Sequence, residues 1–101
     1  MTYLSKYFTL DEMTASQTAA RKRIDNKPGT EILENLKDTC VQADRVRELL
    51  GFPMLISSGY RSLKLNIAVG GSKTSSHLHG YAMDFRCPGF GTPREVFAFL
   101  K

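Results

Sequence analysis

The segment from residue 30 to residue 50 constrains the fold more than any other part of the chain. Its apolar residues recur every three or four positions, while charged residues occupy the other side. The apolar positions are Ile32, Leu33, Leu36, Cys40, Ala43, Val46, Leu49 and Leu50. This period predicts an amphipathic helix that packs its apolar stripe on a core, with Cys40 buried there as an inert thiol. Thr30 stands at the N-cap position and Gly51 at the C-terminal cap, with Pro53 shortly after it.

Three shorter helices are predicted, two of them from their capping residues. Residues 9–12 form a capping box that opens a short helical turn, and residues 16–23 form a second short helix before a turn at 26–29. Residues 92–95 form another helix start, with threonine at the N-cap, proline at the first position and glutamate at the third. That helix has barely two turns before Lys101, and so short a helix is marginal without packing. We therefore expect the chain to end inside an element.

Two short strands are predicted in the second half of the chain. Residues 54–58 favour a buried strand, and residues 81–86 favour a second strand that holds Asp84 in an extended segment. Residues 63–69 alternate between apolar and other side chains, so periodicity alone predicts a further strand there. Residues 70–76 form a flexible polar loop. The expected fold class is α+β, with helices packed on a small, mainly antiparallel sheet that carries the site.

Composition and charge exclude several classes of protein. With 42% hydrophobic and 24% charged residues, the chain is typical of a globular domain. No apolar run approaches the ~20 residues that span a bilayer, and the first residues lack the apolar stretch of a secretory signal. We therefore expect synthesis in a cytoplasm and no membrane insertion, and two cysteines fit a reducing compartment.

The net charge is +4, and the basic residues are densest at residues 21–23. A solvated helix end is the commoner explanation of such a patch, so we expect no nucleic-acid partner.

His77 and Asp84 are the residues that most strongly suggest chemistry. Imidazole and carboxylate are both zinc ligands, and Gly80 between them allows the chain to turn. A catalytic zinc usually has three protein ligands and one open position for water. On spacing alone this pair is weak, because such residues in a stretch rich in glycine and serine are more often surface loop residues. Cys87 follows Asp84 closely, but the spacing is not that of paired cysteine ligands.

The residues around this pair form a longer pattern. It is Ser75-x-His77-x-x-Gly80-x-Ala82-x-Asp84, preceded by Ser57-Ser58-Gly59-Tyr60-Arg61-Ser62, Leu65-Asn66 and Val69-Gly70-Gly71. Near the start stand Tyr7-Phe8-Thr9-Leu10-Asp11-Glu12-Met13, Ser16-x-Thr18-Ala19 and Asp25-Asn26-x-Pro28. In this order, from about residue 7 to residue 86, these motifs resemble the M15 zinc peptidases, in particular their small phage and bacterial branch. That family comprises D-alanyl-D-alanine carboxypeptidases, D,D-dipeptidases and L-alanyl-D-glutamate endopeptidases, which cleave peptidoglycan stem peptides.

The resemblance implies roles for four residues. His77 and Asp84 would be zinc ligands. Arg61 would lie at the edge of the site, where its guanidinium can bind a substrate carboxylate or stabilise an oxyanion. Ser75 would form a hydrogen bond near the site and contribute to substrate binding. The resemblance also implies a helix over residues 63–69, in place of the strand that periodicity predicts, and a fold of the hedgehog/D,D-peptidase type.

The chain departs from the family pattern in one respect. The family has a third zinc ligand, a histidine downstream of the aspartate, with a carboxylate general base a few residues before it. The sequence after Asp84 contains no histidine, and Glu95 lies in the wrong element to be the base. We therefore expect residues 1–101 to form a single peptidase domain that lacks the C-terminal part with these two residues. His79 could be a substitute ligand, although a solvent-facing or supporting role is commoner at such a position.

The function implied by the resemblance is that of a zinc-dependent metallopeptidase, either a carboxypeptidase or an endopeptidase, acting on peptidoglycan stem peptides. Zinc would activate a water for attack on an amide carbonyl, with no covalent intermediate on the protein. The alternative is a non-catalytic cell-wall-binding or virion module that kept the fold and lost the chemistry. A wall enzyme without a signal reaches its substrate by another route, such as a holin or a virion, so a phage or prophage origin is expected.

Overall fold

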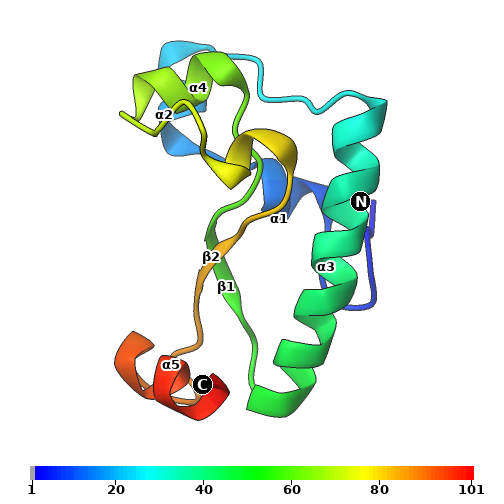
Figure 1. Ribbon diagram of the computed structural model, residues 1–101, viewed down its shortest axis with the longest axis vertical. Helices are drawn as coiled ribbons and strands as arrows, with labels where there is room; N and C mark the ends of the chain where they lie inside the picture. Colours follow the sequence, from blue (N-terminus) through cyan, green and yellow to red (C-terminus); the bar gives the residue numbers. More distant parts are fainter. Residues whose placement is uncertain (1) are drawn as a thin grey trace.

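Figure 1 shows a computed structural model of the chain, which describes residues 2–101. The elements are α1 (Leu10–Thr14), α2 (Gln17–Lys22), α3 (Thr30–Leu50), β1 (Leu55–Ser58), α4 (Leu63–Ala68), the 3-10 helix η1 (Ser76–His79), β2 (Asp84–Arg86) and α5 (Pro93–Leu100). The two strands lie in the middle, with α3 along one side, α2 and α4 at one end and α5 at the other (Figure 1). The predicted α+β class is confirmed. Within the described residues, no helix is both long and apolar enough to cross a bilayer.

The long helix α3 forms where its apolar period predicts it, but it begins one residue early. The prediction of Thr30 as N-cap is wrong, because the N-cap is Gly29, with φ −74° and ψ 176°. Its carbonyl accepts the first helical hydrogen bond, from Leu33 N at 2.9 Å. At the other end Gly51 has φ +77°, the left-handed cap that glycine supplies without strain. The predicted stripe is largely confirmed, except that Leu49 is 65% exposed.

Helices α1 and α5 begin at their predicted caps, and α2 lies within the predicted range 16–23. At α1 both bonds of the capping box are present, with Glu12 N donating to Thr9 Oγ1 at 3.2 Å and Thr9 N donating to Glu12 Oε1 at 3.0 Å. The start of α5 repeats the capping box, with proline in the first turn. The basic residues 21–23 are exposed at the end of α2, as a solvated helix end requires.

The sheet has two antiparallel strands within the described residues, and it is less buried than the sequence predicts. Leu55 pairs with Arg86 and Ser58 with Asp84, with an irregularity between Ile56 and Ser58 that leaves Ser57 as a β-bulge. The prediction of a strand at residues 54–58 is confirmed at Leu55–Ser58, but the prediction that it is buried is wrong, because exposure alternates along β1 and Leu55 is 47% exposed.

β2 and α4 occupy the other two segments that the sequence predicts as strands, residues 81–86 and 63–69. β2 begins only at Asp84, so residues 81–83 precede the strand, although Asp84 lies in an extended segment as predicted. Residues 63–69 contain a helix, α4, so the alternation at these positions misled and the family resemblance was right. Ser62 caps this helix by accepting a hydrogen bond from Leu65 N at 3.2 Å. Of the six residues of α4 only Leu65 and Asn66 are buried, so the helix is too short to show a helical period of apolar residues.

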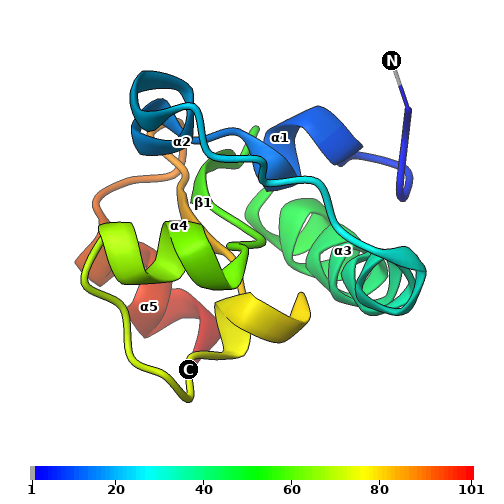
Figure 2. The same ribbon diagram turned by 90° about the horizontal axis from the view of Figure 1, so that it is seen from above.

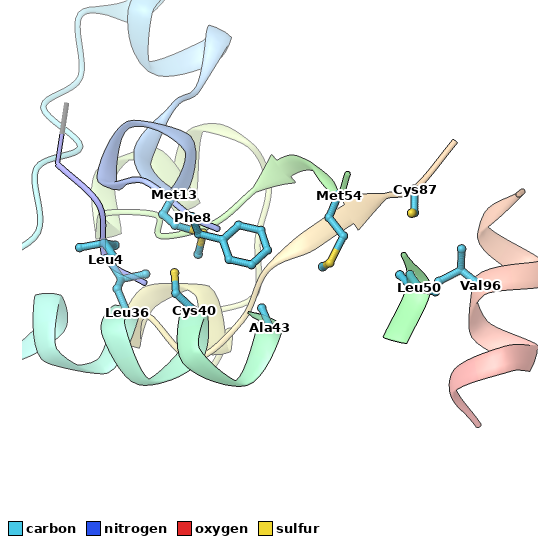
Figure 3. Packing of buried hydrophobic residues seen from close by; sticks show 10 residues of the cluster. All are labelled: Leu4, Phe8, Met13, Leu36, Cys40, Ala43, Leu50, Met54, Cys87 and Val96. Carbon is cyan, nitrogen blue, oxygen red and sulfur yellow. The ribbon is translucent and has the colours of Figure 1, made fainter. Parts of the chain in front are cut away.

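The core joins α3 to the first helix and the sheet. Phe8 and Met13 lie over Leu36 and Cys40, as Figure 3 shows. Leu36 and Cys40 are fully buried, which confirms the expectation of a buried thiol on the apolar face of the helix. The same cluster continues toward α5, where its members are Leu50, Met54, Cys87 and Val96. The core therefore holds α1, α3 and the sheet in fixed positions, and the site is built on η1, the start of β2 and the residues that follow β1.

Burial of Cys40 gives the protein a pH-dependent stability. Burial, followed by the carboxylates of Asp44 and Glu12, raises the pKa of the Cys40 thiol from 9.0 to about 12. The folded chain therefore holds this proton more tightly than the unfolded chain does. We expect the free energy of unfolding to fall as the pH rises above about 9, by up to roughly 1.4 kcal/mol per pH unit.

Urea unfolding between about pH 8 and pH 10.5 measures this slope. Cys40→Ala should remove most of it. Val96→Ala, a core truncation that leaves the thiol in place, should lower stability at every pH and keep the slope. If Cys40→Ala and the unsubstituted chain lose stability at the same rate, the slope has another source.

Candidate functional site

His77 is positioned by the short helix η1 and by α3. Ser75 caps η1, and its Oγ accepts a hydrogen bond from His77 N at 3.2 Å. Gly80 ends η1 with φ +79°, which lets the chain turn toward β2. From α3, Thr39 Oγ1 donates to Gly80 O at 2.6 Å. The long helix therefore fixes the loop on which His77 stands, at the end of β2 away from α5 (Figure 1).

The imidazole of His77 has a defined orientation. Its Nδ1 lies 2.6 Å from Gly59 O. A carbonyl oxygen can only accept, so Nδ1 donates this bond, and Nε2 is the ring nitrogen that remains available to a metal ion. A hydrogen bond from one ring nitrogen to a backbone carbonyl is the usual support of a metal-binding histidine. The side chain of His77 is only 11% exposed, so this orientation is held within the protein.

Asp84 faces the free nitrogen of His77 from the first position of β2. Its Oδ2 lies 3.4 Å from His77 Nε2, and its side chain is 66% exposed. The two atoms thus face each other at the edge of the protein, slightly farther apart than the usual ~2.7–3.2 Å of an N–H···O bond. Across the sheet Asp84 pairs with Ser58, and Ser57 Oγ donates to Asp84 O at 3.1 Å. The bulge in β1 therefore contributes to the placement of the aspartate.

The pair fits two positions of a zinc site. With bonds of ~2.0–2.2 Å to nitrogen and oxygen and tetrahedral angles, two ligand atoms of zinc lie roughly 3.4 Å apart. The observed 3.4 Å between His77 Nε2 and Asp84 Oδ2 matches this spacing. The two donor atoms and their spacing therefore suit two of the ligand positions of a zinc ion.

Arg61 and Ser75 form a connected group with His77. Arg61 N donates to His77 O at 3.1 Å, and Arg61 Nη2 donates to Ser75 Oγ at 3.0 Å. The Nε of Arg61 is buried and has no hydrogen-bond partner in the described residues. Ser75 therefore accepts from both of its neighbours in this group. The structure brings together all four residues that the resemblance singled out.

Asn26 supports this group, a role that sequence reasoning missed. Its Oδ1 accepts from Ser62 N at 2.7 Å, and its Nδ2 donates to Tyr60 O at 3.0 Å and to Thr14 O at 2.9 Å. Asn26 thus holds the residues on both sides of Arg61 and ties them to the end of α1. The signal was its place in the Asp25-Asn26-x-Pro28 motif, which carried no information about its contacts.

The other candidates do not join the pair. His79 is exposed on η1, where its carbonyl accepts a hydrogen bond from Asn35 Nδ2 at 2.9 Å. Cys87 is buried in the core, with Sγ 3.6 Å from Phe52 O. Glu95 is bound into the capping box of α5, where hydrogen bonds with Thr92 lower the pKa of its carboxyl group. Across residues 2–101 no group of three histidine, cysteine, aspartate or glutamate residues lies close enough to hold a metal ion.

Comparison with known proteins places this chain in a family. The chain matches the peptidase M15 family over residues 6–101, and it therefore belongs to that family. No curated protein and no solved structure gives a significant match to it. Members of this family are peptidases, hydrolases that act on peptides, and they are generally metallopeptidases.

Proposed function

We propose that this protein is a zinc-dependent metallopeptidase that hydrolyses peptide bonds in peptidoglycan stem peptides. The observation that carries the proposal is the position of His77 Nε2, which lies 3.4 Å from Asp84 Oδ2, the spacing of two zinc ligands, while Gly59 O holds the other ring nitrogen. Family membership supports the reaction class, and the wall substrate rests on the resemblance of the motifs to wall-cleaving M15 peptidases. The proposed site of action is the cell wall, with a phage or prophage as the source.

The residues of this chain have separate tasks in the proposed mechanism. His77 and Asp84 would hold the ion, with Gly59 O fixing the ring. Zinc bound there would supply a Lewis acid for the scissile carbonyl and for the attacking water. Arg61, whose guanidinium is held by Ser75, binds a carbonyl or carboxylate oxygen of the substrate. We propose that a third ligand and the general base are supplied by residues outside 1–101.

A non-catalytic wall-binding or virion module is the second candidate. The observation that favours it is the lack of a third donor near His77 and Asp84 among the described residues. Such a module would retain the fold and Arg61 but would not need a complete metal site. The two candidates differ in whether bonds in the wall are cut.

Hydrolysis of purified peptidoglycan by the intact protein distinguishes the two functions. A peptidase should release new amino groups in proportion to time, lose this activity with a chelator and regain it with zinc. The wall-binding module should sediment with peptidoglycan, with or without chelator, and release nothing. Release that persists after zinc has been removed completely would contradict the metal dependence.

A further inference from the structure

A cleft of about 800 Å³ lies next to the site, between α2, β1 and α4. This volume is within the ~300–1,000 Å³ of ligand-binding clefts. Neither His77 nor Asp84 lines it, and Arg61 is the residue that belongs to both the cleft and the hydrogen-bonded group around His77. In Figure 2 α2 and α4 lie on two sides of the chain around β1. The cleft therefore extends the site past Arg61.

The wall of this cleft includes the edge of β1. Ile56, Ser57 and Ser58 are consecutive, and all three line it. Side chains alternate between the faces of a strand, and a bulge lets two neighbours share a face at most. Three consecutive residues are reached together only from the edge, where the main-chain N–H and C=O groups lie. The cleft therefore borders the backbone of β1.

This edge has hydrogen-bonding capacity to spare. In the described part of the chain, the main chain of Ile56–Ser58 forms backbone hydrogen bonds with no element other than β2. Farther along, Arg61 N donates to His77 O, in the segment that leads to β2, while Tyr60 N donates to Met13 O at 2.7 Å. Successive N–H groups of an extended chain point to opposite sides, so Tyr60 N marks the edge away from β2. The chain closes that edge at Met13 and leaves the stretch before it open.

The charge of the cleft selects its occupant. Of its twelve lining residues Arg61 alone is charged, and none is acidic. The Nε of Arg61 is buried without a partner in the described residues, so part of its donor capacity remains unused. A guanidinium in a cleft without acidic residues favours a carboxylate. The remaining lining, which includes Ile56, Leu65 and Val69, is apolar enough to accept a peptide backbone with small side chains.

We propose that the cleft binds an extended, carboxylate-bearing segment of the peptide substrate, which adds as a third strand to the open edge of β1. The segment's main chain bonds to residues 56–58, and its carboxylate bonds to Arg61. This inference rests on the proposed peptidase function, because it names where the substrate of that function lies. In strand addition of this kind, main-chain hydrogen bonds provide affinity, and contacts between side chains and the walls of the cleft provide specificity.

Peptide binding to the metal-free protein locates this subsite without hydrolysis. The probe is a synthetic stem pentapeptide ending in D-Ala-D-Ala, titrated into ¹⁵N-labelled protein in the presence of chelator. We expect amide shift changes at residues 16–20, 56–58 and 61. The same peptide with a C-terminal amide should bind about 10-fold more weakly, because the charge-assisted bond to Arg61 is lost. In an added strand every second N–H group of the peptide points toward β1 and the others point away. Methylating the nitrogens that point toward β1 should weaken binding by a similar factor, whereas methylating the others should have little effect.

Variants of α2 separate the cleft from the rest of the surface. Thr18→Phe fills the cleft and should weaken the peptide by about 10-fold or more, since bound backbone atoms are displaced. Lys22→Phe, on the same helix but outside the cleft, should change affinity less than twofold.

Shift changes confined to residues 77–84, or none at millimolar peptide, would overturn the proposal even if the intact protein cleaves peptidoglycan. Shift changes in the cleft without any cleavage by the intact protein would keep this subsite and contradict the peptidase.

Discussion

Replacing His77 with alanine in the intact protein is expected to lower its zinc affinity by at least about 100-fold and to reduce peptide hydrolysis to background. Loss of a residue that merely supports a ligand costs about 10–100-fold in affinity, so loss of a ligand should reach or exceed the upper end of that range. Asp84→Asn should act in the same direction, because it removes the charge that faces His77 Nε2 at 3.4 Å. Competition with a chromophoric chelator measures the affinity independently of activity.

His79 provides the matched control for this prediction. It stands two residues away on the same 3-10 helix, and it is exposed. His79→Ala should leave zinc affinity and hydrolysis within about twofold, because a solvent-facing residue contributes little. A large loss in His79→Ala, with a small one in His77→Ala, would make His79 the ligand and refute the assignment of the pair.

The sequence predicted those parts of the fold that depend on local signals. Capping residues located α1 and α5, and the three- to four-residue period located α3, since both signals lie within the segments that they describe. The site pair was found because His77 and Asp84 belong to one short motif. In α4 the alternation of apolar and other side chains wrongly predicted a strand, because a helix of six residues is too short to show a helical period.

What the sequence did not predict depends on contacts between distant segments. The bond from His77 Nδ1 to Gly59 O joins residues 18 positions apart, and Asn26 reaches Ser62 across 36 positions. No periodicity records such contacts. The bulge at Ser57 and the open edge of β1 likewise follow from pairing with β2, which a single strand does not reveal. Residue types could therefore name the candidate ligands, whereas their orientation required the fold.

Gly59→Ala is expected to lower the free energy of unfolding by about 3 kcal/mol, the upper end of the cost of overpacking. A Cβ at Gly59 would lie 2.9 Å from Met13 Cα and closer still to Met13 O. These are backbone atoms, held by the hydrogen bond from Tyr60 N to Met13 O, so they cannot rotate away as a side chain would. Relief requires a shift of the main chain at Gly59, whose carbonyl orients His77. Zinc affinity should therefore fall together with stability.

Gly29→Ala is the control that separates this steric effect from the general cost of replacing a glycine. A Cβ at Gly29 would meet nothing within 4 Å, and its φ of −74° suits alanine. At this N-cap, alanine loses some capping preference but also reduces the freedom of the unfolded chain, so we expect a net change within about 1 kcal/mol.

Urea unfolding gives the stabilities of both variants, and chelator competition gives their zinc affinities. If Gly59→Ala loses stability while its zinc affinity stays unchanged, the Gly59 carbonyl does not position His77. If neither quantity changes, the close approach of Gly59 to Met13 does not hold in solution. A parallel loss of both in Gly59→Ala, absent from Gly29→Ala, would show that a glycine in the strand-to-helix connection determines how the histidine presents its free nitrogen.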